Sequence, residues 1–363
     1  MLFLQQRENV SIIRHFRFRA LPPGERTTSP LPQIPPAPAG SAENRRKRIH
    51  TARFSLGSAV FLCLGKLVTG ILSGSLGVLA SAMDNVADIF MSAVNLLSIT
   101  KASDPADETH PYGHGKVETA ATLFQGGVIA LTGAGVGWEA VRRLMKGVVP
   151  EGAGLDAGIL VMAFSMAASW FVSERIRKAG EATGSTALMA DSLHFRTDVY
   201  SGGGILLSLL LFRFTGWKWL DPGVALAVGI YIFSAAMPLL AGAVRDLLDT
   251  GLPPETVRSI VQVIERHRPM VRDWHALRTR RSGSEMQVDF HVVLCREQTL
   301  EEAHRVADHL EHDINELLGN AHVVTHIDPC RLDCATTQEC ARMKRMVREF
   351  DGPGQDGMKG ENH

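Results

Sequence analysis

Two acidic side chains lie four residues apart within an apolar stretch of the chain. Asp84 and Asp88 belong to the apolar run from 76 to 99. In a helix, positions i and i+4 lie on one face, about 5–6 Å apart between Cβ atoms. A charged side chain at the centre of a bilayer costs about 2.5–3.5 kcal/mol on insertion scales. Because a bound cation would offset this cost and the mutual repulsion of the carboxylates, the pair predicts a cation site inside a membrane.

A second pair with the same spacing occurs later in the chain. His194 and Asp198 lie four residues apart in the apolar run from 187 to 212. Two helices that face each other would then offer four ligands to one ion. Imidazole and carboxylate ligands around a tetrahedral site suit Zn²⁺, and also Fe²⁺, Cd²⁺ or Mn²⁺. Because the ligands bind metal only when deprotonated, metal and protons would compete for this site.

Two other interpretations of these four residues stay open. They would form a polar network that only holds two helices together, or a catalytic metal site. A catalytic site normally uses three protein ligands and keeps a position for water. No nucleophile–base pair stands out in the sequence. We therefore predict a transport site and not an enzyme.

A third candidate lies in the polar segment that follows the first acidic pair. Asp107, His110 and His114 fall within eight residues of one another. Their residue types could bind one ion. The alternative is a solvated turn in which Lys116 caps the next helix.

The C-terminal part of the chain carries a fourth candidate, made of His275, His291, His304, His326 and Asp328. His275 and His291 are expected on adjacent strands, and His304 on a helix. His326 and Asp328 alternate onto one face of the last strand. A shared metal site and ordinary surface histidines are both compatible with this spacing.

Six apolar segments must position the membrane pairs. They cover about 54–73, 76–99, 117–141, 155–173, 187–212 and 222–244. Each is close to the ~20 residues that a helix needs to cross ~30 Å of hydrocarbon. The soluble alternative, a large buried helical bundle, is disfavoured by six such runs in series. The sequence therefore predicts an α-helical membrane protein with six transmembrane helices in a lipid bilayer.

Positive charges flank the six segments unevenly. One side would collect Arg45, Arg46, Lys47, Arg48, Lys101, Lys116, Arg175, Arg177, Lys178 and Arg245. The other would collect Arg142, Arg143, Lys146, Arg213 and Lys218. Since cytoplasmic loops carry an excess of Lys and Arg, we expect the first side, and with it both termini, in the cytoplasm. The inner (plasma) membrane is the expected location.

The flanks of the membrane segments are polar. Residues 1–50 are proline-rich and basic and predict a disordered arm, followed by the membrane domain over 51–249. Over 250–330, apolar periodicity predicts the order α-β-β-α-β, a small two-layer cytosolic domain. Residues 331–363 predict a polar tail. Lys+Arg and Asp+Glu balance at 38 each, which gives no reason to expect nucleic acid as a partner.

The five cysteines do not form a disulfide framework by their spacing. Cys330, Cys334 and Cys340 match no zinc-ribbon spacing. The interpretation favoured is that they are free thiols, with metal binding as the alternative.

The segment from about Arg48 to Cys330 resembles the cation diffusion facilitator family, and within it the bacterial ferrous-iron and zinc efflux branch. The resemblance is carried by Ser75–Ala80 running into the Asp84 and Asp88 pair, by His110–Lys116, by the His194 and Asp198 pair, by Leu277–Arg280 and by His326–Cys330. The paired membrane motifs are the most specific of these. The arm and the cysteine-bearing tail depart from the family pattern and inherit no role.

This resemblance implies a homodimeric antiporter that exchanges a divalent metal for protons. It implies no prosthetic group, with Zn²⁺ or Fe²⁺ as the substrate and as a ligand of a ferredoxin-like cytosolic domain. The four membrane residues would form the transport site, and the other two clusters a loop site and a cytosolic site in which Asp328 bridges two ions. Lys116 and Asp249 would form a charge pair at the membrane–cytosol junction. The rival function is a metal-sensing or scaffold protein that has lost transport.

Overall fold

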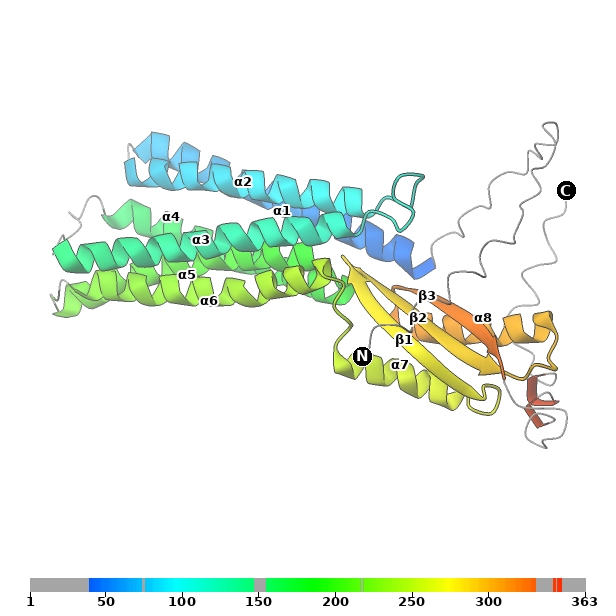
Figure 1. Cartoon of the computed structure of the whole chain (residues 1–363). Coiled ribbons are helices and arrows are strands. Elements are labelled where there is room, and N and C mark those ends of the chain that lie inside the picture. The colour runs from blue at the N-terminus through cyan, green and yellow to red at the C-terminus, as the bar shows by residue number, and fades with distance from the viewer. Residues whose placement is uncertain are drawn as a thin grey trace, which may run out of the picture. The chain divides into compact units, whose positions relative to one another are not determined.

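Six long helices form the first part of the chain (Figure 1). They are α1 (Ala39–Ser73), α2 (Leu76–Ala102), α3 (Lys116–Lys146), α4 (Leu155–Thr183), α5 (Thr186–Thr215) and α6 (Leu220–Leu247). The structure is a computed structural model that describes residues 39–73, 76–146, 155–215, 217, 219–330, 342–343 and 345–347. The predicted arm before residue 39 and most of the predicted tail lie outside the described residues.

Among the described residues, three of these helices are long enough and contain a sufficiently apolar stretch to cross a membrane. They are α1 over Ala42–Leu72, α3 and α6, whose most apolar windows have mean hydropathies of 1.8, 1.3 and 2.1. The other three have similar lengths of 27, 29 and 30 residues. Large apolar side chains such as Leu72, Leu131 and Trp138 stand exposed on the helices. Such faces suit contact with lipid.

The first helix begins earlier than the sequence predicted. Residues 39–50 belong to α1, although they were assigned to the disordered arm. The helix begins directly after Pro38, and its first turns are rich in alanine and charged residues, which favour helix without being apolar. Arg48 is also buried, at 5% exposure, against other elements. Residues 39–50 are therefore helical and not disordered, while the boundary of the membrane domain at residue 51 stays a prediction.

Small residues let α3 and α6 pack closely. A Cβ added at Gly133 would lie 2.6 Å from the Phe233 amide nitrogen, and one added at Gly229 would lie 2.7 Å from the Gly137 nitrogen. Backbones that approach this closely are typical of membrane helix pairs. The two helices therefore pack with their backbones nearly in contact at these glycines.

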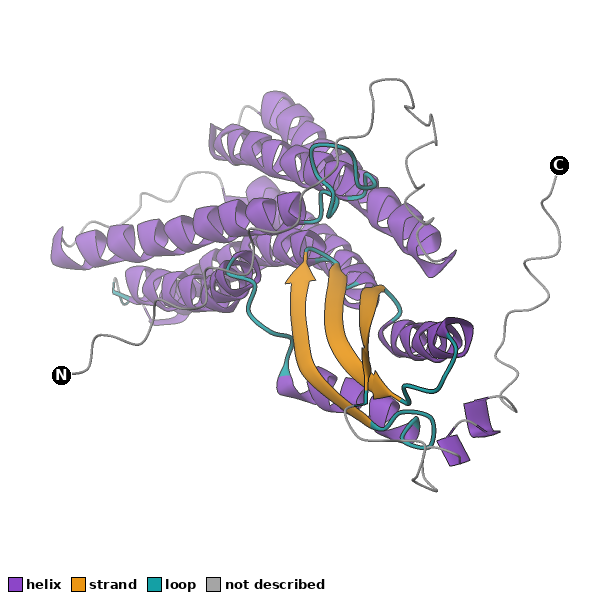
Figure 2. Cartoon of the chain, turned by 45° about the vertical axis from the view of Figure 1, so that its right-hand side comes forward, coloured by secondary structure: helices purple, strands orange, loops and turns teal. Residues whose placement is uncertain are grey.

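The second part consists of α7 (Pro254–Arg266), β1 (Asp273–Ser282), β2 (Glu285–Leu294), α8 (Leu300–Leu318) and β3 (Ala321–Pro329). The strands lie in the order β1-β2-β3, with β1 antiparallel and β3 parallel to β2 (Figure 2). The predicted order α-β-β-α-β is confirmed.

Local sequence explains the ends of these helices. Pro254 occupies the first turn of α7, where its missing N–H is not needed. Thr299 and Glu302 form a capping box at the start of α8, and Gly319 ends that helix in a left-handed conformation with φ 73°.

One face of the sheet is covered by both helices. Val288, Phe290 and Val292 of β2 pack in a common core with Ile260 of α7 and Leu310 of α8. Because side chains alternate along a strand, the residues between them, including His291, point to the other face. The sheet thus separates a helical layer from a face that carries histidines.

Candidate metal sites

The membrane pairs on α2 and α5 meet. His194 on α5 donates from Nε2 to the Asp88 Oδ1 atom on α2 at 2.8 Å. Both side chains are largely buried, at 13% and 11% exposure. The predicted approach of these two helices is therefore confirmed at this contact.

The structure locates the other two predicted transport-site residues, Asp198 and Asp84, only in part. Asp198 follows His194 by one turn of α5 and acts electrostatically on its imidazole, as Asp88 does. The backbone of Asp84 lies in α2, one turn before Asp88. Its side chain lies outside the described residues. The assignment of all four as ligands of one ion stays a prediction.

A further carboxylate, which the sequence interpretation missed, lies beside this pair. Asp191 on α5 is 1% exposed. Its Oδ1 atom accepts from the Ser92 hydroxyl of α2 at 3.5 Å, and Ser92 in turn contacts the Ser55 hydroxyl of α1 at 3.2 Å. Asp191 also acts electrostatically on His194. An acidic residue inside an apolar run is by itself a functional candidate, and that signal could have identified it.

The loop between α2 and α3 brings its three candidates together. The carboxylate of Asp107 lies 3.3 Å from His110 Nδ1 through one oxygen and 3.3 Å from His114 Nε2 through the other. The two rings are 4.5 Å apart between centroids. His114 is buried at 6% exposure, while Asp107 and His110 are exposed. The arrangement forms a small two-histidine, one-carboxylate cluster.

Hydrogen bonds hold the loop carboxylate in its ionised form. The Thr109 hydroxyl donates to Asp107 Oδ1 at 2.8 Å, and the backbone amide of His110 donates at 2.6 Å. These bonds, the hydroxyl first, hold the pKa of Asp107 well below its usual range. A carboxylate that stays charged is a competent cation ligand at any physiological pH.

Three histidines stand side by side on the open face of the cytosolic sheet. His275, His291 and His326 are register partners on β1, β2 and β3. Neighbouring rings lie 5.0 Å and 4.6 Å apart between centroids. Strand β1 has a bulge between His275 and Arg278, in which Ala276 has φ 54°. Bulges are common where a strand re-aims a side chain next to a functional site.

Asp328 lies among these rings. Its Oδ2 atom is 3.1 Å from His291 Nδ1 and 3.3 Å from His275 Nε2. Its Oδ1 atom is 3.4 Å from His326 Nε2. The hydrogen bond with His291 is the main reason that the pKa of Asp328 is lowered. The two carboxylate oxygens face different histidines, as a bridge between two ions would require.

His304 is not brought to this cluster within the chain. It lies on α8, in the helical layer, with its Nε2 atom 3.3 Å from Asp308. Sequence spacing could not predict that His304 lies in a different layer from the other histidines, because that depends on how α8 packs on the sheet. Its assignment to the cytosolic site stays a prediction without support from the geometry of one chain.

Comparison with known proteins decides the family. A family model described as the cation efflux transmembrane domain matches residues 52–248, and one described as the cytoplasmic domain of cation efflux proteins matches residues 252–330. This chain belongs to the cation efflux family. The resemblance to cation diffusion facilitators is thereby confirmed.

Full-length relatives of this cation efflux protein cover most of it. The cation-efflux pump FieF of Shewanella oneidensis is 33% identical over 285 residues, which are 78% of this chain and 95% of that one. The uncharacterized transporter sll1263 of Synechocystis is 30% identical over 280 residues, 77% of this chain and 89% of the relative. A solved structure of a putative zinc transporter, CzrB, in its zinc form is 36% identical and covers 22% of this chain and 90% of its own, with a TM-score of 0.21.

Membership in this family supports the predictions of fold class and of a transport function. The cation efflux protein is a multi-pass membrane transporter of divalent cations and not an enzyme. Its six helices and its α/β cytoplasmic domain with a mixed sheet match the predicted fold class. The metal ion is its substrate.

The prediction of free thiols is wrong for Cys330. Its sulfur is disulfide-bonded. Cys330 is buried next to Cys295 and Met343.

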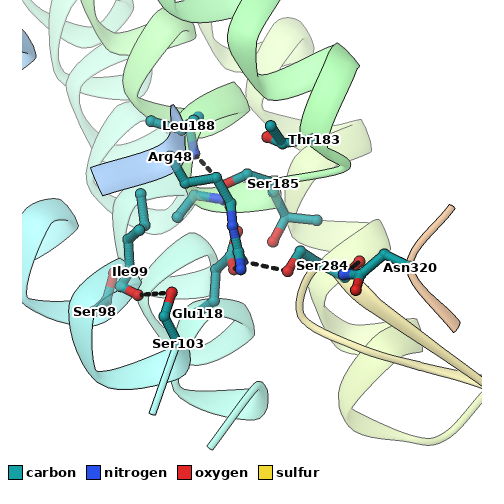
Figure 3. Close-up of polar contacts among 12 residues, drawn as sticks. Arg48, Ser98, Ile99, Ser103, Glu118, Thr183, Ser185, Leu188, Ser284 and Asn320 are labelled. Carbon is teal, nitrogen blue, oxygen red and sulfur yellow. Dashed lines mark hydrogen bonds and ion pairs between the residues drawn. The ribbon is translucent and has the colours of Figure 1, made fainter. Parts of the chain in front are cut away.

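A buried arginine, Arg48, pairs with a glutamate between two membrane helices and also contacts the β1–β2 turn of the sheet (Figure 3). Arg48 of α1 lies 3.2 Å from Glu118 of α3, with side-chain exposures of 6% and 0%. Glu118 also accepts from the hydroxyl of Ser185, just before α5. Arg48 further donates to the Ser284 hydroxyl in the β1–β2 turn, and Asn320 donates to the Ser284 carbonyl at 3.1 Å. One arginine thus contacts both parts of the chain.

The same junction contains the predicted charge pair. Lys116 Nζ lies 2.8 Å from Asp249 Oδ1, and Arg280 Nη1 of β1 lies 3.4 Å from Asp249 Oδ2. The pKa of Asp249 is lowered, mainly by the lysine. Nearby, Gly283 (φ 62°) packs so closely on Gly115 that a Cβ on either residue would overlap the other segment. The pair Lys116–Asp249 is therefore confirmed as a contact.

Proposed function

We propose that this cation efflux protein exports Zn²⁺ or Fe²⁺ in exchange for protons, through a site formed by Asp84, Asp88, His194 and Asp198. The single observation that supports it most is the buried contact between His194 and Asp88 across α2 and α5. Both groups bind metal only when they are deprotonated, so protons that bind to them release the metal. The relatives of this protein are named cation-efflux pumps, which supports export as the direction of transport.

The exchange follows from alternating access. Metal enters the deprotonated site from the cytosol, the helices rearrange, and protons displace the ion on the far side. The protonated site then returns. Three carboxylates and an imidazole carry more negative charge than one divalent ion needs, so at least one proton can share the site. The metal itself is the substrate of this cycle.

The cytosolic cluster would couple metal concentration to the transport cycle. His275, His291, His326 and Asp328 would bind the same class of ion and favour one arrangement of two chains in a homodimer. A ligand shifts such an equilibrium only by its difference in affinity for the two states. The loop cluster of Asp107, His110 and His114 would be a further binding site. Both termini would face the cytoplasm, because the excess of Lys and Arg lies on that side.

The test is zinc/proton exchange in proteoliposomes with a pH gradient. Asp198→Ala and His194→Ala should each abolish metal-driven proton movement, because each removes a ligand of the transport site. The variants should still insert and elute as the parent does. His50→Ala is the matched control, since His50 is an exposed residue of α1. Exchange at the parent rate in both site variants would refute the transport-site assignment.

A further inference from the structure

A fourth group of metal-ligating side chains lies in the helical layer of the cytosolic part. His267 directly follows α7, and His309 and Asp313 lie one turn apart on α8. One donor atom from each lies within 4.8 Å of the other two. The core of β2 separates this group from the histidines on the open face of the sheet. None of the three residues belongs to the sites above.

The separations match those of a tetrahedral metal site. His267 Nε2 lies 3.4 Å from Asp313 Oδ2, and His309 Nε2 lies 3.8 Å from the same oxygen. The two rings are 4.9 Å apart between centroids. Donors bound tetrahedrally at about 2.0–2.1 Å from zinc are about 3.3 Å from one another. The two distances to Asp313 are close to this value, and the two histidine donors, which lie within 4.8 Å of each other, would move together to bind one ion.

The buried histidine is already oriented for this role. His267 is 6% exposed, and its Nδ1 atom lies 2.8 Å from the Val263 carbonyl, to which it donates. Metal-ligating histidines usually donate their other N–H to a carbonyl or a carboxylate, which fixes the ring and its tautomer. In the neutral ring this bond leaves the lone pair of Nε2 directed at Asp313.

The other two ligands remain reachable from solvent. The side chains of His309 and Asp313 are 17% and 28% exposed. An ion could therefore enter from the surface of the domain and would be shielded on its inner side by His267. Three protein ligands leave one tetrahedral position for water. Two imidazoles and one carboxylate favour zinc and similar divalent ions over calcium or magnesium.

We propose that His267, His309 and Asp313 form an additional zinc-type site, which binds a resident divalent cation and fastens the end of α7 to α8. This site is separate from transport, because it lies in the helical layer of the cytosolic domain. Binding replaces the proton that His267 Nε2 needs to hydrogen-bond Asp313 without metal. The bound ion would hold together the two helices that cover the sheet.

The experiment counts zinc bound by the full chain in detergent, after removal of metal with a chelator. His309→Gln and Asp313→Asn are each expected to lose one bound Zn²⁺ per chain, or to weaken one class of site at least tenfold. Each should also lose part of the rise in Tm that Zn²⁺ causes in the parent. His312→Gln is the matched control, because His312 is exposed on the same helix. It should bind as the parent does.

Additivity separates this site from the cytosolic cluster. Asp328→Ala combined with His309→Gln should lose more zinc than either change alone, since the two groups lie on opposite faces of the sheet. An unchanged zinc count and an unchanged zinc-dependent Tm in both His309→Gln and Asp313→Asn would overturn the proposal. The three side chains would then form only an ion pair. If Asp313→Asn unfolds without metal, the partly exposed His309→Gln decides the question alone.

Discussion

The spacing His-x-x-x-Asp recurs on two helices with different outcomes. On α5 it gives His194 and Asp198, whose histidine meets Asp88 of another helix. On α8 it occurs at His304 and Asp308 and again at His309 and Asp313. Only the latter of these two α8 pairs meets a ligand from a distant segment within the described chain. Spacing thus predicts that two ligands share a face, and the fold decides whether a third joins them.

Sequence reasoning reached the ligand pairs because their helical spacing is local. It missed His267, because this residue lies 42 positions before His309 and has no metal-ligand residue three or four positions away. It missed Asp191, although a carboxylate in an apolar run is a visible signal, because Asp191 has no second ligand four residues away. It placed His304 in the cytosolic cluster by residue type and by family resemblance, and the geometry of one chain does not bring it there. The residues found are those whose partners are near in sequence.

Glu285 offers a prediction at the residue scale. Burial is the main reason that its pKa is raised, although Arg48 acts in the opposite direction. The folded state therefore binds this proton more tightly than the unfolded state, whose pKa is about 4.3. Stability should rise as pH falls through the raised pKa toward that value, and the ionised carboxylate should cost stability at neutral pH.

Glu285→Gln should consequently raise the Tm at pH 7 by about 1–3 °C. The gain should shrink as the pH approaches about 4.3, where the parent side chain becomes protonated in both states. Thermal unfolding of the full chain in detergent at several pH values measures this. Glu297→Gln is a suitable control, since Glu297 is exposed in the same domain. A Tm that stays equal or falls at pH 7 would contradict the prediction.

At the scale of elements, apolar runs predicted where helices exist and not where they end. The run over 54–73 belongs to a helix that begins at Ala39, and the run over 155–173 to one that ends at Thr183. The extra turns carry charged residues such as Arg48 and Arg177. Hydrocarbon selects apolar residues only within its own thickness, while hydrogen bonding continues the helix beyond it. The cytosolic elements were placed more closely because caps and turn residues mark their ends.

Close packing of α3 on α6 gives the prediction for this scale. Gly133→Ala should destabilise the protein by about 1–3 kcal/mol, because overpacking a tight contact costs this much and the new Cβ would meet the Phe233 backbone. Gly135→Ala, two residues along the same helix, has nothing within 4 Å of its Cβ. It should be neutral or slightly stabilising, because alanine is the better helix former by roughly 0.5–1 kcal/mol.

Thermal unfolding of both glycine variants in the same detergent makes the comparison. The two substitutions add the same methyl group to one helix, so a difference in Tm reports the contact with α6 and not helix propensity. Equal Tm values for Gly133→Ala and Gly135→Ala would show that the helices separate enough to admit the methyl group. The prediction that close packing of α3 on α6 excludes it would then be refuted.

At the scale of the whole molecule, the junction between the membrane helices and the sheet could not be foreseen. Arg48 is 70 positions from Glu118 and 236 from Ser284. The sequence interpretation used Arg48 only as a positive charge that orients the first span. Burial of the ion pair between α1, α3 and the β1–β2 turn depends on contacts among segments far apart in the chain. The family resemblance predicted the exposed pair Lys116–Asp249 but not the buried pair Arg48–Glu118.

The buried pair makes the last prediction. Arg48→Met should destabilise the protein by about 3–5 kcal/mol, because it leaves the Glu118 carboxylate buried without its counter-charge. Adding Glu118→Gln should recover much of this loss, since no unpaired charge then remains. Arg45→Met is the control: the Arg45–Asp104 pair is 3.7 Å apart with exposures of 46% and 39%, and exposed pairs contribute about 0–1 kcal/mol. Unfolding of the single and double variants yields the coupling energy. If the double variant is as unstable as the sum of its single variants, Arg48 acts through its bond to the Ser284 turn. Arg48 would then stabilise the protein by attaching the sheet to the membrane helices, and not by neutralising the charge of Glu118.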